Sequence, residues 1–171
     1  MFCKKTILAI MCIVALPGAQ GRVNDFEDRV LSAHNRERAA MGVEKLSWDD
    51  ELARGAQRWA DYLSRTGKFH HSTQSRGTQA LGENLWGGTA GHFTAEHMIG
   101  RWIDEKEHFR RGKFPFNSET GDVADVGHYT QVIWRDTRRV GCALSDVGAR
   151  EIVVCRYAKP GNIAGSYPLG R

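Results

Sequence analysis

The sequence predicts an α+β domain in which helices come first and an antiparallel sheet comes last. Apolar residues recur at helical spacing in three segments of the first two-thirds of the chain. Three short segments rich in β-branched and aromatic residues follow, at 128–135, 138–145 and 150–158. Both faces of segment 128–135 carry apolar side chains, so we expect helices to cover the sheet on both sides.

Local end signals justify each helix. The three expected helices run from a capping box at Asn24 and Glu27 to about Ala40 before Gly42, from a cap at Ser47 or Asp49 to Gly67, and from a cap at Thr94 through 95–109. Segments 67–93 and 110–126 are polar or glycine-rich and are expected to form loops, and the tail after Pro160 is expected to be a surface-packed coil.

The first 21 residues have the pattern of a secretory signal peptide. Two lysines precede the apolar stretch 6–16, which is too short to span a bilayer as a helix. Ala19 and Gly21 then stand at the two positions that a signal peptidase reads. We therefore expect an exported protein, secreted or periplasmic, with one domain over residues 22–171 and no transmembrane anchor.

The charge of the chain argues against one class of partner. The sequence has 24 Lys and Arg residues and 20 Asp and Glu residues. The signal peptide contains two of the basic residues and no acid, so the net charge of the mature chain is +2. Because no basic run with interleaved aromatic residues is present, we expect no nucleic-acid partner.

Two cysteines remain after the signal peptide, and an even number in an exported chain indicates one disulfide. The surrounding segments resemble two strands that flank a turn at Gly148 and Ala149. With these two residues at the centre of the turn, Cys142 lies opposite Cys155 at a non-hydrogen-bonded pair, where side chains approach most closely. The register therefore predicts the disulfide Cys142–Cys155.

The segment GHYTQVIW, residues 127–134, places a histidine in an apolar setting. As a strand, it puts His128 on the same face as Val132 and Trp134. His128 is then either a core histidine with satisfied hydrogen bonds or a member of a functional site. Finding other groups that meet His128 distinguishes the two interpretations.

Two carboxylates and a histidine pair are the other candidates. Glu105 lies on an apolar helical stripe with Trp102, so it either reaches the edge of the stripe or has a buried partner. Glu83 follows a glycine that permits close backbone approach, and it is either a loop acid or part of a site. His70 and His71 are adjacent, and such pairs also occur as surface polar residues.

Common enzyme motifs are absent from the sequence. It contains no G-x-S-x-G elbow, no H-E-x-x-H, no phosphate-binding loop and no G-x-G-x-x-G. No mature cysteine remains for nucleophilic catalysis if Cys142 and Cys155 are paired.

Several separated motifs resemble the CAP superfamily, also called the SCP domain, which includes cysteine-rich secretory proteins, insect venom allergens and plant pathogenesis-related proteins. The motifs are GHYTQVIW, RVGCAL and VVCRYAKPGN, preceded in the family's order by AHNRERAAMGVEKLSWDDELARGAQRWA, HS, GENLW and WIDEKEHF, and together they cover residues 28–162. The resemblance implies a three-layer α-β-α sandwich with a central antiparallel sheet. It also implies a cleft with two histidines and two acids, which by motif are His71, Glu83, Glu105 and His128.

The chain departs from many eukaryotic members in ways that suggest a minimal member. It can form one disulfide only, and Val126 stands where a cysteine often precedes the glycine of GHYTQ. It has no N-x-S/T sequon and no cysteine-rich extension. A bacterial source would fit this reduced form.

The resemblance suggests a binding role, since family members have been linked to sterol or lipid binding, metal binding, defence against microbes and proteolysis. We expect a secreted, monomeric binding module rather than an enzyme, and we assign no catalytic residue. His71 and His128 are the expected ligands of zinc or another divalent metal, with the two glutamates as further ligands or as orienting groups.

Two further hypotheses concern lipids and catalysis. Phe114 and Phe116 lie in the loop that precedes GHYTQ, where they either form an apolar lip for a sterol or other lipid or pack the loop onto the core. The alternative to a binding module is a hydrolase of the protease kind. Its base would be Glu83 or Glu105 beside a metal-bound water, or it would use Ser72 in a Ser-His-Glu arrangement.

Overall fold

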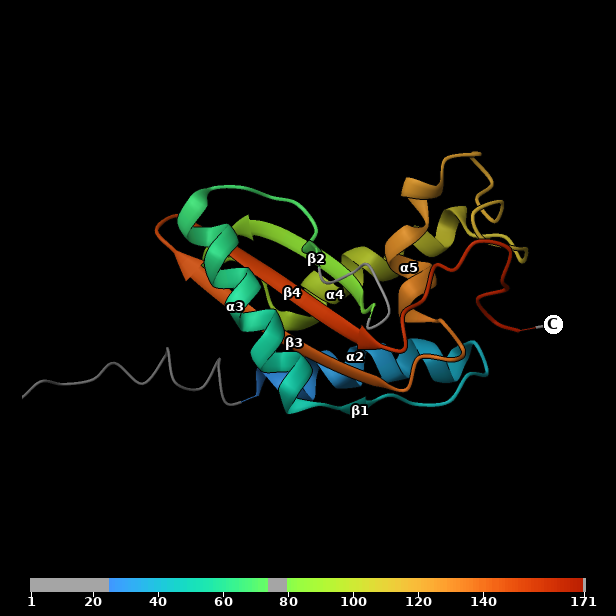
Figure 1. Ribbon diagram of the computed structural model, residues 1–171, viewed down its shortest axis with the longest axis horizontal. Helices are drawn as coiled ribbons and strands as arrows, with labels where there is room; N and C mark the ends of the chain where they lie inside the picture. The colour runs from blue at the N-terminus through green and yellow to red at the C-terminus, as the bar shows by residue number, and fades with distance from the viewer. Residues whose placement is uncertain (1–24, 74–79, 171) are drawn as a thin grey trace, which may run out of the picture.

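The computed structural model describes residues 25–73 and 80–170, which form a four-stranded sheet with helices on both faces (Figure 1). In chain order the elements are α2 (Phe26–Ala40), β1 (Ser47–Trp48), α3 (Asp50–Thr66), β2 (Gly82–Thr89), α4 (Ala95–Asp104), the 3-10 turns η2 (Glu105–His108) and η3 (Val123–Asp125), α5 (Gly127–Val132), β3 (Arg139–Val147) and β4 (Arg150–Ala158). The predicted signal peptide and the predicted cap at Asn24 lie outside the described residues.

The sheet has the strand order β1-β3-β4-β2. β4 is antiparallel to both β3 and β2, and the two-residue β1 is parallel to β3. Val147 pairs with Arg150 around the turn, and Cys142 pairs with Cys155. The Cα atoms of the two cysteines are 4.1 Å apart and their sulfurs are bonded, which confirms the predicted disulfide.

Alternation along the strands builds two hydrophobic layers. On β4, Val153, Cys155 and Tyr157 belong to the core that α2, α4 and α5 share with the sheet. Ile152 and Val154 belong to the second core, under α3. The result is a three-layer α-β-α sandwich, which confirms the expected fold.

The predicted helix ends are confirmed in α3 and at the start of α4. The Asp49 carboxylate accepts from the amides of Glu51 and Leu52 at 2.9 and 3.0 Å, and Gly67 ends α3 with a φ of 66°. The Thr94 hydroxyl accepts from the His97 amide at 3.2 Å. The third helix is shorter than predicted, because α4 ends at Asp104 and a 3-10 turn follows.

The predicted strand at 128–135 is wrong, because residues Gly127–Val132 form the helix α5. The strand propensity of Tyr, Thr and Val is overridden by tertiary contacts. The Glu105 carboxylate accepts from the amides of His128 and Tyr129 at 2.9 and 3.0 Å, which satisfies two donors at the start of the helix. Tyr129 and Val132 then face the core on the α2 side of the sheet.

The loop predicted for 67–93 is wrong in part, because Gly82–Thr89 form the strand β2 along β4. The strand contains three glycines, which have low strand propensity, so residue propensities do not predict it. Side chains from elsewhere occupy the space that Cβ atoms would need: a Cβ on Gly82 would lie 2.0 Å from Gln131 Oε1, and one on Gly87 would lie 3.1 Å from Phe69. The glycines are therefore packing positions within a sheet.

A buried arginine ties α2 to the segment that joins α5 and β3. Arg38 is fully buried, and its guanidinium donates to the carbonyl oxygens of Glu44, Val132, Trp134 and Thr137 at 2.7 to 3.0 Å. Burial lowers the pKa of Arg38 to about 10. Four backbone acceptors, rather than a carboxylate, compensate the removal of this cation from water.

Candidate functional site

Four predicted site residues form two histidine–glutamate pairs. His71 Nδ1 lies 3.0 Å from Glu83 Oε1, and His128 Nδ1 lies 2.5 Å from Glu105 Oε1. Both imidazoles use Nδ1 for a carboxylate, which leaves Nε2 as the atom that can meet a ligand. The side chains of His71 and His128 are 56% and 35% exposed, so solvent reaches both rings.

Glu83 is held at the start of β2, and its side chain is almost fully buried. It accepts from the Ser72 amide at 2.8 Å and from the Ser72 hydroxyl at 2.7 Å, in addition to His71. Arg156 lies 3.5 Å away on β4. Burial raises the pKa of Glu83, but the hydrogen bonds from His71 and Ser72 outweigh this effect and keep the pKa below its ordinary value. Glu83 is therefore a fixed anion that orients His71.

Glu105, the first residue of η2, makes different contacts with each of its two carboxylate oxygens. One oxygen meets the His128 ring and the other accepts the backbone amides at the start of α5. Trp102, one turn earlier, lies nearly parallel to the His128 ring with centroids 6.1 Å apart. Its indole N–H donates to the Leu85 carbonyl of β2 at 3.1 Å. The position of His128 is thus set by a carboxylate on one side and an aromatic face on the other.

A buried network of hydrogen bonds connects the site to α2 and β4. The His34 ring donates from Nδ1 to the Val30 carbonyl at 2.8 Å, so its Nε2 accepts from the Tyr157 hydroxyl, also at 2.8 Å. The Asn84 amide donates to the Tyr157 hydroxyl at 3.3 Å and to the His128 carbonyl at 3.1 Å. Burial raises the pKa of Tyr157 and lowers that of His34 to about 4. This network therefore links α2, β4 and β2 to α5, and within it the His34 ring is neutral and the Tyr157 hydroxyl is protonated.

Asn84 also relates the two pairs to each other. It follows Glu83 on β2 and bonds the backbone of His128, so the two pairs come from neighbouring parts of the molecule. Within residues 25–73 and 80–170, no three His, Cys, Asp or Glu side chains are grouped so that they could hold a metal ion. Convergence of all four side chains on one cleft stays a prediction.

Three supporting residues of the site were not predictable from the sequence. Asn84, Tyr157 and His34 connect to the site through the buried hydrogen-bond network described above. Their role depends on contacts between residues 73 and 123 positions apart, which leave no local signal. Trp102 was recognisable only as part of an apolar stripe.

The neighbours of His71 have other tasks. His70 Nδ1 donates to the His71 carbonyl at 3.0 Å, and its ring packs edge-on against Trp59 and Tyr62. Ser72 donates its hydroxyl proton to Glu83. A Ser-His-Glu nucleophile would instead give that proton to an imidazole.

The two phenylalanines of the loop before α5 are separated in their environments. Phe114 packs edge-on against Trp134 with centroids 6.4 Å apart. Phe116 is 78% exposed. No helix in the described parts of the chain has the length and apolar character required to cross a membrane.

Comparison with known proteins identifies the class. The cysteine-rich secretory protein family, CAP, matches residues 31–157. The chain belongs to the CAP family. Pathogenesis-related protein 1C of Nicotiana tabacum is 37% identical over 169 residues, which cover 98% of this chain and 92% of the relative. Secreted protein RBT4 of Candida albicans is 35% identical over 146 residues, which cover 84% of this chain and 37% of the relative.

Solved structures resemble the fold. The crystal structure of NaASP2 with Zn2+ has a TM-score of 0.73 and 22% identity, and the match covers 92% of this chain and 90% of that one. The hookworm platelet inhibitor has a TM-score of 0.68 and 19% identity over 86% of this chain and 76% of that one. At these identities the likeness concerns the fold. The sequence relatives named above come from a plant and a yeast, so they do not support a bacterial source.

Acid should weaken the fold through His34. Its pKa lies near 4 in the folded chain, against an ordinary value of 6.5, because burial disfavours the charged ring. Between these two pH values, His34 therefore binds a proton in the unfolded chain but not in the folded chain. This contribution to stability, about 3 kcal/mol, is fully present above about pH 6.5 and is lost as the pH falls toward 4.

Urea unfolding of wild type and His34→Gln across this pH range measures the effect. The wild type should lose about 3 kcal/mol more than the variant between pH 6.5 and 4. His108→Gln removes an exposed histidine and should keep the wild-type slope. An equally steep profile for His34→Gln would contradict the assignment.

Proposed function

We propose that this protein is a secreted binding module whose two histidine–glutamate pairs bind a divalent metal ion, with zinc as the first candidate. The export step is supported by the signal pattern of the first 21 residues and by similarity to a family described as secretory. The single observation that carries the metal proposal is the shared geometry of the imidazoles. Each places Nδ1 within hydrogen-bond distance of a carboxylate, which leaves Nε2 for a ligand, and each side chain is partly exposed to solvent.

This arrangement fits the chemistry of a metal-binding histidine. A carboxylate at Nδ1 fixes the tautomer in which Nε2 carries the lone pair, and it raises the basicity of the ring. Glu83 and Glu105 thus have the role of orienting groups, because their oxygens are already bonded to protein donors. With two nitrogen ligands and water completing the shell, we expect a weak, solvent-open site rather than a structural zinc.

Calorimetric titration of the mature protein with zinc near neutral pH tests the proposal. His71→Ala and His128→Ala should each weaken binding by about tenfold or more, because each removes one of two nitrogen ligands. Glu105→Gln should weaken it by about tenfold through the lost orienting charge. Binding should also weaken on acidification, because protons compete for the imidazoles.

The adjacent histidine provides the matched control. His70→Ala should leave zinc affinity unchanged, since the His70 ring is engaged by the His71 carbonyl and by Trp59. Loss of binding in His70→Ala would show that the wrong member of the pair has been assigned. Equal affinity in all variants would show that the pairs are structural.

The exposure of Phe116 supports a second role in binding a sterol or other lipid. The Phe116 side chain is 78% exposed on a polar loop, so it contributes little buried apolar area to the fold. Phe114 instead packs against Trp134, so the loop offers one apolar side chain rather than a lip of two.

Binding of radiolabelled cholesterol by the purified protein tests this role. Phe116→Ser should lose most of the binding because it removes the exposed apolar group. Phe69→Ser, which removes another aromatic side chain that is 50% exposed, is the control and should bind as wild type does. Equal binding by wild type and Phe116→Ser, or none by either, would reject the lipid role.

A further inference from the structure

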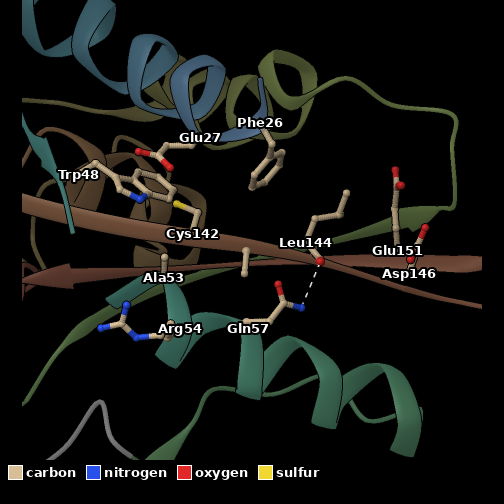
Figure 2. A pocket seen from close by; sticks show the side chains of 11 residues that line it. Phe26, Glu27, Trp48, Ala53, Arg54, Gln57, Cys142, Leu144, Asp146 and Glu151 are labelled. Atoms are coloured by element: carbon tan, nitrogen blue, oxygen red, sulfur yellow. Dashed lines mark hydrogen bonds between the residues drawn. The ribbon is translucent and has the colours of Figure 1, made fainter. Parts of the chain in front are cut away.

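A groove lies along the outer edge of β3 and shares no residue with the two histidine–glutamate pairs. Its volume is about 490 Å³. Figure 2 shows it between α2 and α3, which lie on opposite sides of the strands. Its apolar lining consists of Phe26, Trp48, Ala53, Cys142, Ala143 and Leu144.

The backbone of β3 faces this groove along several residues. β1 covers only the first two residues of β3, after which the chain turns into α3. The Val140 carbonyl accepts from the Asp49 amide at 2.9 Å, so the backbone groups of Val140 point to the outer edge. Because backbone groups alternate along a strand, those of Cys142, Leu144 and Asp146 point the same way.

Most of these outward groups have no partner among the described residues. The Leu144 carbonyl accepts from Gln57 at 3.3 Å, as Figure 2 shows, and the same Gln57 nitrogen donates to Asp61 at 2.8 Å. Over 25–73 and 80–170, no acceptor is bonded to the outward amides of Cys142, Leu144 and Asp146. An uncovered strand edge of this kind pairs readily with an extended chain.

The charge of the groove selects among extended chains. Asp146 is an exposed acid at one end of the groove, whereas Glu151, opposite it on β4, is buried and accepts from the Gly91 amide at 3.0 Å. Glu27 lies at the other end, and burial together with two neighbouring carboxylates raises its pKa. Arg54 is the one cation among the described residues that line the groove. A ligand that brings a positive charge is therefore favoured over an acidic one.

We infer that this groove binds an extended peptide as an added strand on β3, with an apolar side chain in the cavity and a lysine or arginine beside Asp146. The peptide backbone bonds to Cys142, Leu144 and Asp146. These three positions span roughly 13 Å, so the bound segment is about five residues long. Side chains that alternate along the peptide then point by turns into the cavity and toward solvent.

Amide hydrogen exchange of the mature protein, read by NMR, tests the inference. The probe is an acetylated and amidated hexapeptide of alternating lysine and valine. At saturation, the amides of Cys142, Leu144 and Asp146 should exchange about tenfold more slowly or better. The intervening amides, which bond to β4, should change by less than about twofold.

Two altered peptides and a pair of variants separate the causes. The same peptide methylated on its valine nitrogens, and a glutamate–valine version, should both fail to protect the edge. Asp146→Asn should weaken binding by about threefold to tenfold, whereas Glu119→Gln, an exposed acid in the loop before α5, should not change it.

Three outcomes would overturn the inference. Equal protection by the methylated peptide would show that no strand is added. Equal protection by the glutamate–valine peptide would show that charge does not select the ligand. Protection of the edge that rises with protein concentration alone would assign the edge to a second copy of the chain.

Discussion

Replacement of Arg38 by methionine should destabilise the protein by about 4 kcal/mol. The methionine fills most of the space but leaves four carbonyl oxygens, three of them buried, without the guanidinium donor. Each unsatisfied acceptor is costly, although removal of a buried cation offsets part of the loss. Urea unfolding near neutral pH measures the change.

Two further variants test the explanation for Arg38. Arg38→Lys keeps the charge but cannot reach four acceptors with one compact ammonium, so it should lose a large part of the same stability. Arg36→Met, two residues away on the exposed side of α2, should change the free energy of unfolding by less than about 0.5 kcal/mol. If Arg36→Met and Arg38→Met are equally stable, the carbonyl contacts do not support the fold.

Gly82→Ala should destabilise the protein by about 3 kcal/mol and disturb the site at Glu83. The added Cβ would lie 2.0 Å from Gln131 Oε1. That oxygen cannot simply move, because Gln131 is buried and its Oε1 accepts from the Gly161 amide at 2.8 Å. The start of β2 must shift instead, and Glu83, which follows Gly82, shifts with it. The affinity for zinc should therefore fall together with the free energy of unfolding.

The clash with Gln131 can be isolated by a double-mutant cycle. Gln131→Ala removes the opposing side chain, so Gly82→Ala should cost less in that background than in wild type. Gly100→Ala is the matched glycine control, since a Cβ on this residue of α4 would meet no atom of the described residues within 4 Å. It should stabilise the protein by up to about 1 kcal/mol. Additive effects at Gly82 and Gln131 would rule out the steric explanation.

The parts of the fold that were predictable have local causes. Asp49 and Thr94 cap their helices through groups two or three residues away, and Gly67 supplies the left-handed residue that ends α3. The pairing of Cys142 with Cys155 follows from a two-residue turn in the same hairpin. Short-range chemistry of this kind can be read directly from the sequence.

The errors at α5 and β2 have long-range causes. α5 consists of residues with strand propensity, and its helical form depends on Glu105, which lies 23 residues earlier than His128. β2 contains glycines because Gln131 and Phe69 occupy the space beside it. Neither cause is visible in the segment that it governs.

The four candidate site residues were chosen by motif, but the way they pair could not be predicted from the sequence. Family resemblance selected the four residues, whereas the partner of each histidine depends on how the start of β2 and the end of α4 are placed. The choice of His71 over His70 illustrates this limit of local reasoning. Adjacent imidazoles have the same chemistry, and the difference between them is that Glu83 meets one and Trp59 meets the other.

The distribution of the site along the chain has a consequence for folding kinetics. The hydrogen bonds that define it join residues separated by 12, 23, 44, 73 and 123 positions. No short fragment of the polypeptide contains all of these residues. The site therefore forms only after the slow, non-local contacts have formed. An ion that binds there cannot nucleate folding, as zinc does in a finger domain. It instead selects chains that have already folded and shifts the equilibrium in their favour by mass action.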